Sequence, residues 1–74
     1  MKDLHEEIYE LTATINLVIA TIDTVKEKRM HYLWEENMYL ADYFASEEVR
    51  LNKVLDKMYT KQEKLYRELL IEFL

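Results

Sequence analysis

Three side chains that could bind a metal ion stand at successive steps of four along the chain. At that spacing Glu27, His31 and Glu35 share one face of a helix. Carboxylate metal sites in helical bundles take a Glu-x-x-His step from each of two helices. The sequence contains no such step. We therefore expect a solvated His–Glu pair here, with no metal and no cofactor.

Polar residues inside otherwise apolar helical patterns could carry catalysis. Arg29, Asn37 and Gln62 occupy such positions. A single buried polar residue in a helical bundle often fixes the register or the oligomeric state. Catalysis would need a second titrating group and a pocket, and the sequence indicates neither. We expect a structural role for these residues, no catalytic residue, and a protein that is not an enzyme.

Aromatic residues concentrate near the middle of the chain. Tyr and Trp are enriched at binding hot spots because each combines apolar area with a polar group. For Trp34 and Phe44 we favour burial in the core, whereas the tyrosines lie either in an interface or half-buried on a helix. The candidate partner-binding residues are Tyr32, Trp34, Glu35, Glu36, Tyr39, Asp42 and Tyr43.

The composition predicts helices only. The 74 residues include no Gly, no Pro and no Cys, so tight hairpin turns and disulfides are not available, while 50% hydrophobic residues indicate a folded chain. We expect one helical domain, residues 1–74, with helices at about 3–29, 31–45 and 46–73. Asp3 with Glu6, and Ser46 before two glutamates, mark the expected helix starts. These helices form either a three-helix bundle or an antiparallel hairpin that turns at Ser46.

The first helix is expected to be covered on more than one side. Its apolar residues alternate steps of four and three, and its back carries Ala13, Leu17, Ala20 and threonines in place of charges. In the hairpin, residues 3–17 would overhang with this apolar stripe bare. Both architectures predict a homo-oligomeric helical bundle, a homodimer or larger. The candidate oligomer-seam residues are Leu4, Ile8, Leu11, Ile15, Leu17, Val18, Ile22, Val25, Leu69 and Phe73.

The charge pattern points away from nucleic acid and membranes. The net charge is −5, whereas phosphate binding needs a basic surface. Six basic residues on the last helix are expected to be neutralised within the oligomer: Arg50, Lys53, Lys57, Lys61, Lys64 and Arg67. The uninterrupted apolar run 15–22 is short for a membrane span, and the acidic start is unlike a secretory signal. We expect a cytoplasmic protein whose partners are itself and another protein.

Residues 38–62 resemble the second half of the helical-hairpin aspartyl-phosphate phosphatases that act on bacillar sporulation response regulators. At the positions of that family's Ser-Gln-Glu-Leu-Asp signature stand Asn52, Lys53, Val54, Leu55 and Asp56. Leu55 and Asp56 agree, and the resemblance implies a regulator that acts through Asp56. Residues 21–24 and 50–51 are similar to small enterobacterial haemolysin-modulating nucleoid proteins. Since two unrelated families match at so few positions, we adopt neither as an identification.

The pattern as a whole predicts a small acidic interaction protein. We expect a non-catalytic inhibitor or regulator, of the antitoxin-like or phage accessory kind, that acts by binding a partner protein. The alternatives are a phosphatase-like regulator dependent on Asp56, and a purely structural coiled-coil oligomerisation module.

Overall fold

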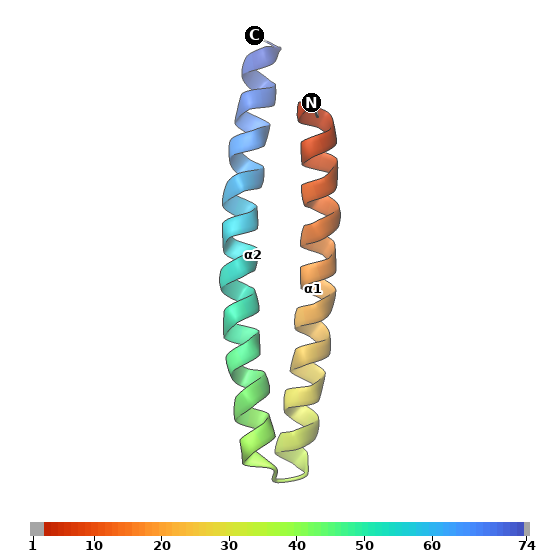
Figure 1. The fold of residues 1–74 in the computed structure, drawn as a ribbon, viewed down its shortest axis with the longest axis vertical. Helices are drawn as coiled ribbons and strands as arrows, with labels where there is room; N and C mark the ends of the chain where they lie inside the picture. Colours follow the sequence, from red (N-terminus) through yellow and green to blue (C-terminus); the bar gives the residue numbers. More distant parts are fainter. Residues whose placement is uncertain (1–2, 74) are drawn as a thin grey trace.

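A computed structural model describes residues 3–73, which form an antiparallel helical hairpin (Figure 1). Helix α1 spans Leu4–Trp34 and helix α2 spans Met38–Glu72, and the two pack against each other along their length. The hairpin measures 57 × 18 × 15 Å. The prediction of an all-α chain is confirmed, and of the two expected architectures the structure has the antiparallel hairpin, with its turn at residues other than Ser46.

The expected helix boundaries inside each arm are wrong. Residues 29–31 lie inside α1, and Ser46 lies in the third turn of α2 rather than at a helix start. Helix propensity and the apolar seam continue through both positions, and no Gly or Pro interrupts them. The three-helix bundle and the hairpin turning at Ser46 are therefore both excluded for the described residues.

The chain turns at residues 35–37 through a helix ending that ordinarily uses glycine. Asn37 N–H donates to the Tyr32 carbonyl at 2.8 Å and Glu36 N–H to the Leu33 carbonyl at 3.1 Å. These two bonds define a Schellman motif, whose C′ residue adopts the left-handed conformation. Glu36 takes that place with φ 60°. Asn37 then caps α2, its Oδ1 accepting from Leu40 N–H at 3.2 Å.

The N-terminal cap of α1 is the one that the sequence predicts. The Asp3 side chain accepts from Glu6 N–H at 2.8 Å, and Glu6 and Glu7 add negative charge in the first turn. This arrangement satisfies one of the free donors of the helix and suits the helix dipole.

The core is the seam between the two helices. Ile8, Ile15 and Ile22, seven residues apart, are buried on α1, and Ala41 and Leu65 are buried on α2. Because the turn lies at residues 35–37, the helices have similar lengths of 31 and 35 residues. Residues 4–17 therefore lie beside α2, and the expected overhang is wrong.

Two polar contacts cross the seam. Arg29 Nε donates to Glu48 Oε2 at 3.0 Å, and Gln62 Nε2 donates to Thr12 Oγ1 at 3.0 Å. Arg29 and Gln62 thus link the two helices at different heights, in agreement with their expected place in the seam. Asn37 does not belong to this group, because it caps α2 in the turn.

Candidate protein-binding site

The tip of the hairpin exposes two large aromatic side chains. Trp34, the last residue of α1, is 89% exposed, and Tyr39, in the first turn of α2, is 83% exposed. The expectation that Trp34 lies in the core is wrong, since the helix ends at this residue and its side chain is left in solvent. Singly exposed aromatic residues are common, whereas several at one end of a molecule make that end a candidate binding surface.

Further apolar side chains are exposed at the same end of the hairpin. Met30, Leu33, Met38 and Tyr43 are all exposed and belong to the last two turns of α1 or the first two of α2. Tyr39 and Tyr43 also line a shallow hollow on the outer side of α2, together with Asp42 and Ser46. The tip therefore combines apolar anchors with a small concave surface.

Tyr32 and Phe44 are half-buried and support the tip from inside. Their rings stack with centroids 5.6 Å apart, and Tyr43 meets Phe44 edge-on at 5.2 Å. Lys28 Nζ lies 5.6 Å from the centre of the Phe44 ring, within cation–π range. Tyr32 was expected to belong to the partner-binding surface together with Tyr39 and Tyr43. It lies instead on the other helix and faces the seam, so it positions the site rather than forming its surface.

The tip is acidic. Glu35, Glu36 and Asp42 are exposed around the aromatic residues. His31 Nε2 lies 3.3 Å from Glu35 Oε1, and both side chains are exposed, as the expected solvated His–Glu pair requires. In the part of the chain that the structure describes, no three His, Cys, Asp or Glu side chains gather into a group that could hold a metal ion.

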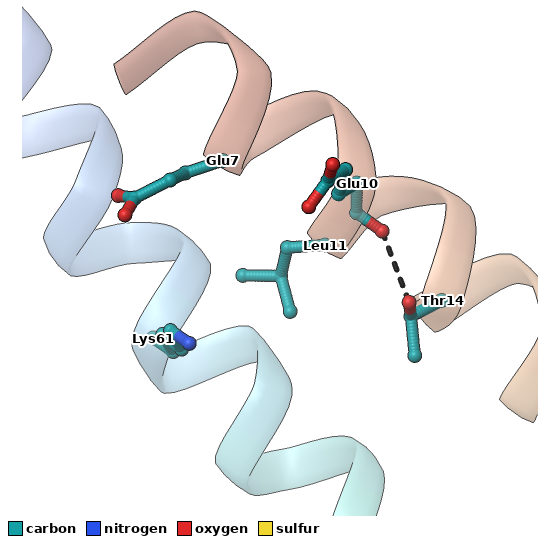
Figure 2. A pocket seen from close by; sticks show the side chains of 5 residues that line it. All are labelled: Glu7, Glu10, Leu11, Thr14 and Lys61. Atoms are coloured by element: carbon teal, nitrogen blue, oxygen red, sulfur yellow. Dashed lines mark hydrogen bonds between the residues drawn. The ribbon is translucent and has the colours of Figure 1, made fainter. Parts of the chain in front are cut away.

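A second hollow lies between the helices near the open end (Figure 2). Glu7, Glu10, Leu11 and Thr14 of α1 line it with Lys61 of α2. Leu11 points into the space between the helices, and Thr14 Oγ1 donates to the Glu10 carbonyl at 3.0 Å. The hollow is open to solvent and offers carboxylates and an ammonium group, but no nucleophile paired with a base.

Most candidate oligomer-seam residues hold the two helices of one chain together. All of those between Leu4 and Val25, Leu17 excepted, are buried or half-buried in the hairpin, as is Leu69. Leu17 is 69% exposed and Phe73 is 75% exposed. The apolar stripe of α1 is therefore already covered by α2, and only these two candidates remain available to another chain.

Eight of the fifteen large apolar side chains that are exposed among the described residues share one broad side of the hairpin. The Thr12–Gln62 hydrogen bond marks this side, while Glu7, Thr14 and Lys61 mark the opposite one. Helical geometry places on the first side the residues that are three, four or seven positions from Thr12 and Gln62, and those that repeat at seven beyond them. We call this surface the long face; its exposed apolar residues are Tyr9, Ile19, Met30, Leu33, Met38, Tyr59, Tyr66 and Phe73.

The six basic residues of α2 are all exposed. Arg50 bonds the Glu47 carboxylate at 2.6 Å, and this hydrogen bond together with the carboxylate charge raises the pKa of the Arg50 guanidinium. The Arg67 guanidinium likewise bonds the Glu63 carboxylate at 2.6 Å, and these two residues are one helical turn apart. Asp56 is exposed on α2, and its backbone carbonyl accepts from Thr60 Oγ1 at 3.0 Å.

Helix α1 is long and apolar enough to cross a membrane by length and composition alone. One 18-residue window has a mean hydropathy of 1.3, and 22% of that window is buried in the hairpin. Core helices and signal sequences have the same property. The expectation of a cytoplasmic protein therefore stays a prediction.

The fold and the tip define a two-helix hairpin with an exposed aromatic end. A search among known proteins finds no matching family model, and neither a curated protein nor a solved structure is significantly similar to the chain. Functional conclusions therefore rest on the geometry described above.

Proposed function

We propose that this chain is a non-catalytic interaction protein that binds a partner protein through the hairpin tip and acts as its inhibitor or regulator. The exposure of Trp34 and Tyr39 carries the proposal. Large rigid aromatic side chains gain much contact area on binding and lose little conformational freedom, which makes them the usual anchors of interfaces.

The negative charge of the tip indicates which kind of partner surface it would bind. Glu35, Glu36 and Asp42 surround the anchors, and all three are exposed. A basic surface with an apolar pocket complements such a tip, because opposite charges raise the association rate and disfavour wrong partners. The mechanism is steric: the bound hairpin covers the partner's surface.

The proposal also includes self-association and a cytoplasmic location. A chain of 74 residues with only five buried apolar side chains among those described has a small core, and small domains commonly gain stability by oligomerising. Nucleic acid is a poor partner for a chain of net charge −5.

Quantitative affinity purification tests the tip. The tagged chain is recovered from the cells that produce it, and co-purified proteins are compared for the wild type, for Trp34→Ala with Tyr39→Ala, and for Asp56→Ala. We expect a specific partner to be lost with the tip variant and retained with Asp56→Ala. Both tip side chains are exposed, so circular dichroism should show unchanged helicity.

The same variants, assayed also for phosphatase activity, separate the alternatives. Loss of activity toward a response regulator with Asp56→Ala, at unchanged helicity, would favour the phosphatase-like regulator. Equal recovery of the partner with the tip variant would favour a purely structural coiled-coil module and contradict the proposed site.

A further inference from the structure

We propose that a second copy of this chain covers the long face, with the two hairpins packed face to face and tip to tail. The inference deepens the self-association in the proposed function: it assigns the surface and the arrangement. The product is an antiparallel four-helix bundle whose two-fold axis crosses the middle of the long face.

The two broad sides of the hairpin differ sharply in charge. The side opposite the long face carries Glu7, Lys28, Lys57, Lys61 and Glu68, whereas the long face carries Asp23 and Lys26, both on α1. On the long face, the positions of α2 that lie beside the seam repeat at every seventh residue and contain no charge. This α2 row is Met38, Ala45, Asn52, Tyr59, Tyr66 and Phe73. An uncharged row along an entire exposed helix indicates contact with another helix.

The α2 row is self-complementary in size when it meets its own copy in the antiparallel direction. Ala45 then faces Tyr66, and Asn52 faces Tyr59, so each tyrosine meets a smaller residue. At the ends Met38 faces Phe73, and a flexible thioether packs well against an aromatic ring. Alternating large and small residues across facing helices is how such layers interdigitate.

The exposed residues of α1 obey the same two-fold axis. When the axis passes through Ile19, that residue meets its own copy and Tyr9 meets Met30. Asn16 then faces Asp23, and its side-chain amide can donate a hydrogen bond to the carboxylate. The contacts Thr12–Gln62 and Arg29–Glu48 place Ile19 close to the level of the midpoint between Asn52 and Tyr59. One axis therefore serves both helices.

The edge of the long face argues for protein rather than lipid. Asp42, Asp56 and Glu63 lie along the α2 edge. Helices that lie on a membrane surface carry Lys and Arg beside their apolar face, because the lipid surface is negative.

The acidic edge also has a consequence for the dimer: the two-fold axis brings Asp56 of one copy near Asp56 of the other. Asp56→Asn should tighten the dimer several-fold by removing this repulsion.

Disulfide cross-linking with light scattering tests the arrangement, since the wild-type chain contains no cysteine. Ile19→Cys should give a covalent dimer under mild oxidation, because a disulfide needs Cβ atoms about 4 Å apart. Leu17→Cys, on the outer side of α1 and 69% exposed, is the matched control and should stay uncross-linked. Tyr66→Glu should weaken the dimer at least roughly tenfold without loss of helicity.

The results of light scattering and cross-linking distinguish self-association from the assignment of the long face. A wild-type chain that is monomeric across the concentration series overturns the inference and the self-association on which it rests, but leaves the tip proposal intact. A dimer that cross-links through Leu17→Cys, or that fails to cross-link through Ile19→Cys, keeps self-association and overturns the assignment of the long face. A dimer that Ile19→Cys traps and Tyr66→Glu weakens supports it.

Discussion

Arg29 and Glu48 form an ion pair across the two helices, with Nε and Oε2 3.0 Å apart and side chains only 31% and 17% exposed. The other ion pairs described for residues 3–73 lie within one helix or at its end. A pair at this depth fixes how far one helix is shifted along the other, because a slip of one turn would leave both charges without a partner.

Removing one member of this pair should destabilise the hairpin. Arg29→Ala leaves the carboxylate of Glu48 partly buried and uncompensated, so we expect the free energy of unfolding to fall by about 1–2 kcal/mol. Urea unfolding followed by circular dichroism measures the change. Replacing both residues, Arg29→Met with Glu48→Leu, should restore most of the stability. As a control, Arg67→Ala removes an exposed ion pair and should change the free energy of unfolding by less than about 0.5 kcal/mol.

The left-handed residue of the turn offers an opportunity to stabilise the protein. Glu36 has φ 60°, which is unfavourable for residues with a side chain and favourable for glycine. Glu36→Gly should raise the free energy of unfolding by about 1 kcal/mol, measured as a shift of the urea midpoint. Glu35→Gly is the matched control: φ at Glu35 is −81°, so glycine there should lower stability. The reverse order of the two variants would contradict the described turn.

The isoleucine seam should dominate the stability of each chain. Ile15 is 3% exposed, and Ile15→Ala should cost about 2–4 kcal/mol through lost burial and an internal cavity. Because the domain is small, this loss of stability should let the chain unfold at moderate temperature. Thermal unfolding should show it as a lower midpoint. Leu17→Ala, two positions away and 69% exposed, should leave the midpoint nearly unchanged. Equal effects of the two substitutions would mean that α1 is covered on its outer side.

Membrane association can be checked because α1 passes the length and composition test for a span. We expect the chain in the soluble fraction after alkaline carbonate extraction of cell membranes. The apolar stripe of α1, including Ile8, Ile15 and Ile22, is buried against α2, and Glu6 and Glu7 sit in its first turn. Recovery in the membrane pellet would show that α1 leaves α2 for lipid and would contradict the cytoplasmic proposal.

The seam of the hairpin could be predicted from the sequence, but the turn could not. Steps of four and three from Leu4 to Val25 identify the buried stripe of α1 because helix periodicity is strong over several heptads. The turn was missed because Glu36 adopts a conformation that usually requires glycine, so no residue type marks it. Asn37 before Met38 was the available signal, as a helix cap, but its place among apolar residues suggested a buried polar group.

The missed turn also explains the errors at the candidate site. A helix expected over residues 31–45 placed Trp34 and Phe44 on one core face, and it placed Tyr32 beside Tyr39 and Tyr43. Once the chain reverses at residues 35–37, these residues belong to two helices, and Trp34 comes to the exposed end. The residue types of the site were therefore predictable, whereas their arrangement depended on one backbone conformation.

The most direct test of the proposed function is photo-cross-linking from the tip in living cells. A photoreactive phenylalanine analogue replaces Trp34, and in a control chain it replaces Arg67, which is exposed on α2 far from the tip. We predict a cross-link to a distinct partner protein from position 34 that is absent from position 67 and is lost when Tyr39→Ala is added. If position 34 gave no cross-link to another protein, or if positions 34 and 67 gave the same products, a binding site at the hairpin tip would be contradicted.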